Sequence, residues 1–180
     1  MERFTTSDGV AIAYEFDASA PPGLPPVVLL HGFAVSGQLN FGGPGLIDGL
    51  ADADRRTIVV DARGHGDSDK PTDPAVFGEA RMAQDVRELV DHLGLDAFDL
   101  IGYSMGAVVA LLIAADDPRV RRMAVGGVGS GIIETGGVDS REMPKHMIVQ
   151  AMLAPDADAV EYPLGAAWRA FAEAVDADLS

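Results

Sequence analysis

The sequence contains no cysteine among its 180 residues. Disulfide bonds, a thiol nucleophile and cysteine-ligated zinc are therefore excluded. The four histidines include no pair at the spacing that metal sites use, so we expect neither a metal ion nor another cofactor.

Positive charge is scarce, because 13 Lys and Arg stand against 28 Asp and Glu, which gives a net charge of −15 at pH 7. Such an acidic chain repels phosphate groups, so we expect neither nucleic acid nor an anionic membrane as a partner.

Long apolar runs are also missing. The longest, from Ala107 to Ala115, is too short to span a bilayer, and Met1 to Thr5 lack the apolar core of a secretion signal. We expect a cytoplasmic protein.

Apolar residues are nonetheless plentiful, at 48% of the chain with a mean hydropathy of +0.15. This content can fill the core of one compact globular domain. Short apolar runs alternate with longer segments of helical character. These patterns predict strands at residues 4–6, 10–16, 27–30, 57–60, 98–101 and 120–125, and helices at residues 46–53, 79–93 and 105–115.

The alternation of strands and helices predicts an α/β fold, with a mostly parallel sheet and helices on both of its faces. The first two strands flank the turn at Asp8 and Gly9, which predicts an antiparallel hairpin at the sheet edge. Beyond residue 131 the alternation stops, and residues 141–153 and 164–175 have helical character. We therefore predict a core domain over residues 1–131 and a helical segment over residues 132–180.

One motif carries chemistry. Gly102-Tyr103-Ser104-Met105-Gly106 fits G-x-S-x-G and lies between a predicted strand and an apolar predicted helix. The sharp turn of such a motif strains the serine backbone and exposes its hydroxyl, and it requires small residues on either side, which Gly102 and Gly106 supply. The start of the helix also directs free N–H groups toward an oxyanion at the serine. The motif predicts Ser104 as a nucleophile and the Met105 N–H as an oxyanion-hole donor.

Two further motifs each follow a predicted strand: His31-Gly32-Phe33, and Asp61-Ala62-Arg63-Gly64-His65-Gly66-Asp67-Ser68. With the three motifs in this order, the sequence resembles the α/β-hydrolase superfamily over residues 4–131, in detail its serine esterase-like branch with a short helical cap. The resemblance implies that the Phe33 N–H is the second oxyanion-hole donor and that residues 132–180 form part of a cap. We interpret His31 and His65 as histidines that fix loops by hydrogen bonds.

A serine hydroxyl needs a histidine base that a carboxylate orients, and in this fold the chain order is Ser, acid, His. His146 is the only histidine after Ser104, and it lies in a predicted helix instead of following a strand. Glu134, Asp139 and Glu142 precede it, and none of them follows a strand either. The sequence thus offers no convincing triad acid or histidine. We expect a chain truncated after the cap begins, the alternative being a complete chain without a triad.

These residues predict a serine hydrolase that acts on carboxylic esters or related small-molecule acyl compounds through an acyl-enzyme on Ser104. Amide, lactone, thioester, carbon–carbon bond and perhydrolase chemistries stay open. A serine at this position argues against the dehalogenase and epoxide-hydrolase chemistries of the superfamily, which use a carboxylate nucleophile. The alternative is a non-catalytic α/β-hydrolase-like module that binds a small molecule. The sequence determines neither the substrate nor the oligomeric state.

Overall fold

The computed structural model describes residues 1–130. By its internal contacts the chain divides into two units, Met1–Gly129 and Ser130–Ser180, and the fold below is that of the first. The segment predicted as a partial cap, residues 132–180, lies outside the described residues, and so does His146.

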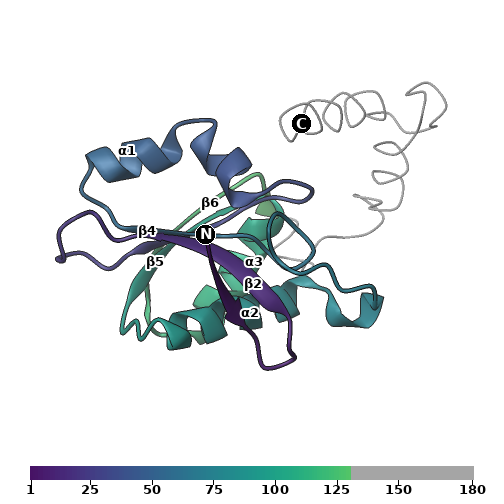
Figure 1. Cartoon of the computed structure of the whole chain (residues 1–180). Helices are drawn as coiled ribbons and strands as arrows, with labels where there is room; N and C mark the ends of the chain where they lie inside the picture. Colours follow the sequence, from purple (N-terminus) through teal and green to yellow (C-terminus); the bar gives the residue numbers. More distant parts are fainter. Residues whose placement is uncertain (131–180) are drawn as a thin grey trace, which may run out of the picture. The chain divides into compact units, whose positions relative to one another are not determined.

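Six strands form one sheet in the order β1-β2-β4-β3-β5-β6 (Figure 1). β1 pairs with β2, and β2 with β4, in antiparallel fashion, whereas β3 runs parallel to both β4 and β5, and β5 parallel to β6. The mostly parallel sheet and the hairpin at its edge are therefore confirmed. The strands are β1 (Glu2–Thr5), β2 (Ala11–Asp17), β3 (Val27–Leu30), β4 (Thr57–Val60), β5 (Phe98–Tyr103) and β6 (Val120–Gly126).

Helices cover both faces of the sheet, as predicted. α1 (Leu46–Asp52) lies on one face, and α2 (Glu79–His92) and α3 (Met105–Asp116) lie on the other (Figure 1). The predicted bounds of all three hold to within one residue. Two short helices were not predicted: η1 (Gln38–Gly42), a π-helix, and η2 (Pro74–Val76), a 3-10 helix.

The core has two layers because side chains along a strand alternate between its faces. Every residue of β3 and β4 is buried, as expected for strands covered on both sides. One layer packs Val28, Leu30, Ile58, Val60 and Leu100 against α2 and α3. The other packs Val27, Leu29 and Val59 against Phe41 of η1 and against Ile47 and Leu50 of α1. Each fully buried aliphatic side chain contributes roughly 1.5–3 kcal/mol.

Parallel strands direct their carboxyl ends to one edge of the sheet, which is where open α/β sheets bind ligands. The loops after β3, β4 and β5 leave from that edge. These loops contain the three motifs found in the sequence. The fold thus brings together segments that are about thirty to seventy residues apart in the chain, starting at His31, Asp61 and Ser104.

Candidate active site

Ser104 occupies a strained turn between β5 and α3. Its φ of 51° and ψ of −112° lie in a region that residues with a side chain rarely adopt. The Ser104 N–H donates to the Gly126 carbonyl at the end of β6, at 2.8 Å, which ties the turn to the neighbouring strand. Strain of this kind persists only where the surroundings hold it, and it is typical of functional positions.

The two glycines of the motif are required by close backbone contacts. A Cβ on Gly106 would lie 2.0 Å from the Leu30 carbonyl oxygen, and a Cβ on Gly102 would lie 2.4 Å from the Gly106 carbonyl oxygen. Both distances are far shorter than any real contact. The sharp turn at Ser104 is therefore possible only with glycine at these two positions, as the motif predicts.

The two predicted oxyanion-hole donors lie in segments that flank Ser104. Met105 is the first residue of α3, where backbone N–H groups have no partner within the helix. Phe33 follows Gly32, and a Cβ built on Gly32 would lie 3.5 Å from Cβ of Ser104, so the loop after β3 passes beside the serine. Among the described residues, no acceptor receives the N–H of Phe33 or of Met105. The part of the chain that the structure describes therefore provides neither N–H group with an acceptor.

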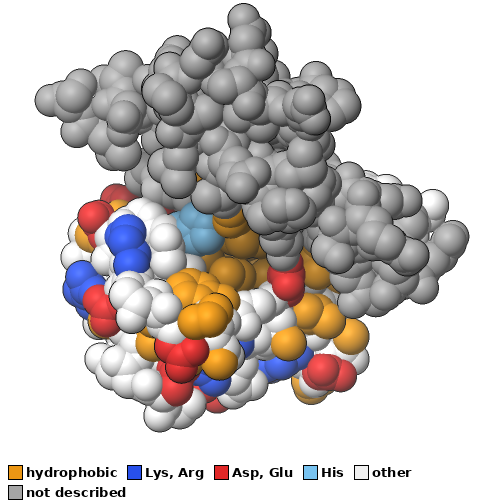
Figure 2. Space-filling model, turned by 90° about the vertical axis from the view of Figure 1, so that its right-hand side faces the viewer, with side chains coloured by type: hydrophobic (Ala, Val, Ile, Leu, Met, Phe, Trp, Pro, Cys, Tyr) orange, Lys and Arg blue, Asp and Glu red, His pale blue; other side chains and the backbone are white. Residues whose placement is uncertain are grey.

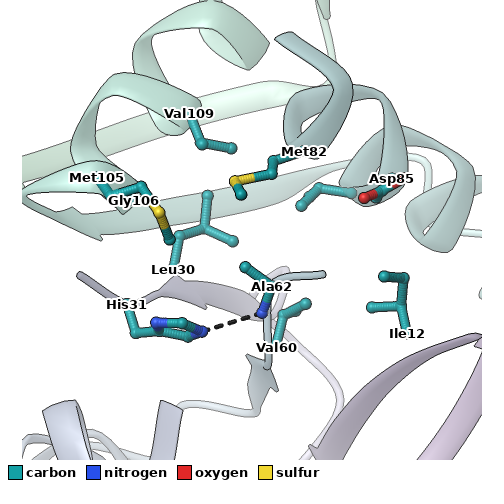
Figure 3. A pocket seen from close by; sticks show the side chains of 11 residues that line it. Ile12, Leu30, His31, Val60, Ala62, Met82, Asp85, Met105, Gly106 and Val109 are labelled. Carbon is teal, nitrogen blue, oxygen red and sulfur yellow. Dashed lines mark hydrogen bonds between the residues drawn. The ribbon is translucent and has the colours of Figure 1, made fainter. Parts of the chain in front are cut away.

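His31 is a structural histidine. It is buried, with 1% of its surface exposed, and its Nε2 accepts the Ala62 N–H at 2.9 Å (Figure 3). Because Nε2 is an acceptor, Nδ1 carries the proton and donates to the Gly32 carbonyl at 2.7 Å. Burial lowers the pKa of His31 to about 4, although the bond to Gly32 opposes the shift. This ring is thus neutral and fully engaged, which excludes it as a base for Ser104.

The loop after β4 is held by side chains at both ends. Asp61 accepts the N–H of Gly37 at 2.8 Å and the N–H of Asp67 at 2.9 Å, and so joins this loop to the one after β3. Ser68 donates to the Asp61 carbonyl at 2.6 Å and accepts the Ala13 N–H at 2.7 Å. These bonds therefore join the loop after β4 both to the loop after β3 and to β2.

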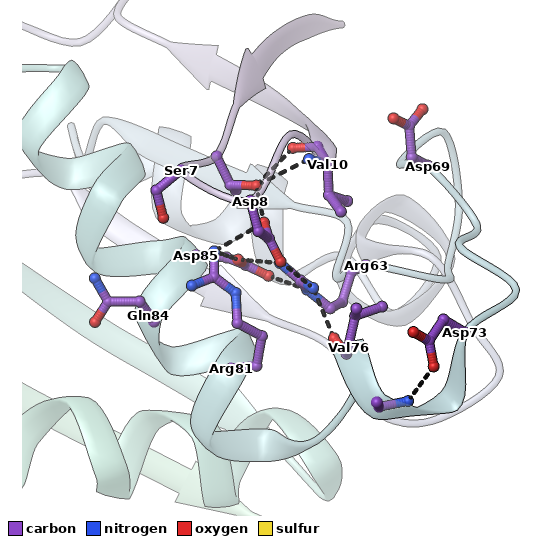
Figure 4. A network of polar contacts seen from close by, with 12 residues as sticks. Ser7, Asp8, Val10, Arg63, Asp69, Asp73, Val76, Arg81, Gln84 and Asp85 are labelled. Carbon is purple, nitrogen blue, oxygen red and sulfur yellow. Dashed lines mark hydrogen bonds and ion pairs between the residues drawn. The ribbon is translucent and has the colours of Figure 1, made fainter.

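Arg63 anchors the same loop to α2 and to the β1–β2 turn (Figure 4). Its side chain is fully buried and donates two hydrogen bonds of 2.6 Å to Asp85, one of 2.6 Å to the Val76 carbonyl and two, of 3.0 and 3.2 Å, to Asp8. The bond from Arg63 holds the pKa of Asp8 below its ordinary value. Burial raises the pKa of Asp85, with Arg63 and Arg81 opposing the shift. A buried guanidinium paired in this way fixes geometry more than it adds stability.

His65 packs against His31 and Phe33 of the loop after β3. Its ring centroid lies 5.2 Å from that of His31 and 5.7 Å from that of Phe33, both edge to face. Its Nδ1 lies 3.1 Å from the Arg63 carbonyl, and burial lowers its pKa. These contacts agree with the interpretation of His65 as a residue that fixes a loop.

A small apolar cavity lies beneath the turn, between the sheet and helices α2 and α3 (Figure 3). Leu30, Met105 and Gly106 line it on the side of the motif, and Met82 and Val109 line it on the side of the helices. These side chains are mostly buried, whereas the side chain of Tyr103, the residue before the serine, is half exposed. Figure 2 shows a histidine bordered by apolar side chains on the described surface.

Asn40 is a residue of this region that the sequence analysis did not single out. It lies in η1, and its Oδ1 accepts the Gly32 N–H at 2.9 Å. No motif marks such an asparagine, because its partner Gly32 is eight residues away in the chain. Glu134, Asp139, Glu142 and His146 lie outside the described residues.

Within residues 1–130 no three His, Asp or Glu side chains are grouped closely enough to hold a metal ion. No helix in the same range is long and apolar enough to cross a membrane.

A family model described as alpha/beta hydrolase fold matches residues 25–154. The chain therefore belongs to the α/β-hydrolase family. It is 38% identical, over 125 residues, to a soluble epoxide hydrolase of Corynebacterium sp. strain C12, covering 69% of this chain and 41% of that protein. It is 41% identical, over 102 residues, to the sn-1-specific diacylglycerol lipase ABHD11 of Mus musculus, covering 54% of this chain and 30% of that protein.

Solved structures agree with this assignment. A thermophilic esterase from Thermogutta terrifontis is 28% identical and superimposes with a TM-score of 0.62, covering 84% of this chain and 52% of that one. The chain spans less than half the length of the two curated relatives and about half that of the esterase.

Proposed function

We propose that this chain supplies the nucleophile and the oxyanion hole of a serine hydrolase that acts on carboxylic esters or related acyl compounds. The observation that carries the proposal is the strained backbone of Ser104, with the N–H groups of Phe33 and Met105 in the segments on either side, for which residues 1–130 provide no acceptor. A serine held in a strained turn and flanked by backbone N–H donors is the arrangement that acyl transfer requires.

In this reaction the Ser104 hydroxyl oxygen attacks the carbonyl carbon of the substrate, and the carbonyl electrons move onto its oxygen. The N–H groups of Phe33 and Met105 stabilise the negative charge that develops there, and loss of one such donor typically costs about 10²–10³ in rate. The serine proton passes through a base to the departing alcohol. Water then hydrolyses the acyl-serine ester, which releases the carboxylic acid and restores Ser104.

The base comes from outside the described residues in this proposal. Within residues 1–130, no side chain forms a hydrogen bond with the Ser104 hydroxyl. Of the histidines within residues 1–130, His31 uses both ring nitrogens and His65 has its Nδ1 3.1 Å from the Arg63 carbonyl. His92 lies at the end of α2 with its ring against Phe4. His146 stays a candidate.

Several relatives are named for ester or lipid substrates, and others for epoxides. The chemistry of a serine favours the first group. A serine oxygen that opened an epoxide would form an ether, which has no carbonyl for water to attack, so the enzyme would stay blocked. A serine that attacks an ester forms another ester, which water can hydrolyse.

Fluorophosphonate labelling of the chain, read by intact mass, tests the proposal. We expect one adduct on the wild type, none on Ser104→Ala, and one on Ser19→Ala, because Ser19 is an exposed serine on the same chain. If the wild type is labelled, His146→Gln shows whether His146 is the base. A folded wild type that takes up no label shows that nothing in this chain activates the Ser104 hydroxyl, whereas labelling that persists in Ser104→Ala contradicts the proposal.

The second candidate function is a non-catalytic module that binds a small molecule. It is favoured by the Ser104 hydroxyl, which has no base beside it among the described residues. This alternative predicts saturable binding of an ester or carboxylic acid together with no labelling. Turnover of an aryl ester that disappears in Ser104→Ala excludes it.

A further inference from the structure

Hydrogen bonds on both sides of Gly32 hold the orientation of the peptide unit that contains the Phe33 N–H. The Gly32 carbonyl, in the same peptide unit as the Phe33 N–H, accepts from Nδ1 of His31 at 2.7 Å. The Gly32 N–H, in the preceding unit, donates to Oδ1 of Asn40 at 2.9 Å. A peptide unit is planar, and its C=O and N–H point in opposite directions. Holding both polar groups of Gly32 therefore fixes the direction of the Phe33 N–H.

This loop needs such fixing. Glycine rotates about its backbone bonds more freely than any other residue, so Gly32 cannot hold the two peptide planes by itself. Ala34, two residues further on, has a φ of 62°, which is a strained conformation for alanine. A strained residue that lies close to a flexible glycine keeps its backbone conformation only if surrounding groups hold it. Asn40 and His31 are the side chains that do so.

Asn40 is itself well anchored and close to the nucleophile. Its N–H donates to the Ser36 carbonyl at 3.0 Å, and the next residue, Phe41, is buried in the smaller core layer. A Cβ built on Gly32 would lie 3.5 Å from Asn40 Oδ1 and 3.5 Å from Ser104 Cβ, so these two atoms are within about 7 Å of each other. The Asn40 carboxamide therefore lies close to Ser104.

We propose that Asn40 is a positioning residue, which holds the Gly32 N–H so that the Phe33 N–H points at the acyl oxygen of a substrate bound at Ser104. The proposal rests on the proposed function. Asn40 works through Gly32 and makes no bond to the reacting atoms. His31 holds the other side of Gly32, and the two side chains together determine the orientation of one donor of the oxyanion hole.

The variant that tests this role is Asn40→Leu, which keeps the side-chain size and removes the acceptor. Gln38→Leu is its matched control, because it makes the same chemical change in the same helix at a residue whose amide donates to exposed Glu15. Asn40→Asp retains an acceptor for the Gly32 N–H. Amide hydrogen exchange of Gly32 and Phe33, by NMR, reports on the loop without any reaction.

We expect exchange at Gly32 to accelerate at least tenfold in Asn40→Leu, and to change less than twofold in Asn40→Asp and Gln38→Leu. The maximal rate of fluorophosphonate labelling should fall about tenfold to a hundredfold in Asn40→Leu, below the full loss of a donor. The probe concentration for half-maximal rate should stay within twofold, because the donor acts on the charged transition state. Gln38→Leu should be labelled like the wild type.

Two results overturn the proposal. One is unchanged exchange at Gly32 in a folded Asn40→Leu, which would show that the bond does not hold the loop. The other is accelerated exchange with an unchanged maximal labelling rate, which would show that the orientation of Phe33 does not matter to the reaction. Failure of the proposed function looks different, because labelling then persists in Ser104→Ala while the exchange comparison still gives its answer.

Discussion

Acidification should destabilise the described unit through a single buried ring. His31 accepts a backbone N–H at Nε2 and donates from Nδ1, so it has no place for a second proton. Burial accordingly lowers its pKa to about 4, from an ordinary value of 6.5. Protonation would place an N–H at Nε2 against the N–H of Ala62, two donors facing each other inside the protein.

The sign and size of the effect follow from linkage. Between pH 6.5 and pH 4 the unfolded chain binds a proton on His31 and the folded chain does not, so the free energy of unfolding falls as the pH falls. Each pH unit in this window costs about 1.4 kcal/mol. Across the whole window the loss from His31 is roughly 3 kcal/mol, and below pH 4 it levels off.

Urea unfolding at half-unit steps from pH 7.5 to pH 4 measures this loss. Other groups titrate in the same range, so the wild type is compared with His31→Gln. The free energy of unfolding of this variant should depend less steeply on pH than that of the wild type, by about 1.4 kcal/mol per pH unit. Should that variant fail to fold, the NMR titration of the His31 Cε1 proton in the wild type gives the pKa directly. A midpoint at or above 6.5, or equal slopes in the two proteins, would refute the reasoning.

Three other changes should shift stability in directions that the packing dictates, each measured by urea unfolding at pH 7. Gly106→Ala should cost at least about 2 kcal/mol, because the new methyl group meets the Leu30 carbonyl, and a change under 0.5 kcal/mol would contradict the contact. Gly49→Ala in α1 is its control and should add about 0.5–1 kcal/mol, since no atom lies within 4 Å of the new Cβ. Arg63→Met should cost about 3–5 kcal/mol by leaving Asp85 buried without its main partner, and adding Asp85→Leu should restore part of that loss. If the double variant is the less stable, the buried pair is not the source of the cost.

Much of the fold was predictable from local patterns. The strands at residues 27–30 and 57–60 and the starts of all three α-helices appear where the sequence places them, because apolar runs and helical periodicity are local signals. β5 extends two residues further than predicted, to Tyr103, since Gly102 and Tyr103 pair with β6 through their backbones. Backbone pairing depends on the neighbouring strand and not on residue type.

The candidate site likewise has features that local sequence patterns predict and features that only the packing creates. The motif around Ser104 is readable because its two glycines are next to the serine in the chain, and the same holds for the helix start at Met105. Asn40 gives no such signal, and neither does the bond from Ala62 to His31. These contacts join residues that only the packing of three loops at one sheet edge brings together.

The sequence by itself determined the order of strands and helices, the acidic surface charge and the place of a strained serine, since each depends on residues close together in the chain. Only the tertiary structure decided which side chains orient the loop beside that serine. It also showed that His31 is held neutral and that Arg63 is paired with Asp85 and Asp8. The physical reason is that burial and hydrogen-bond partners are properties of the packed chain, and they set both the protonation and the direction of the groups around Ser104.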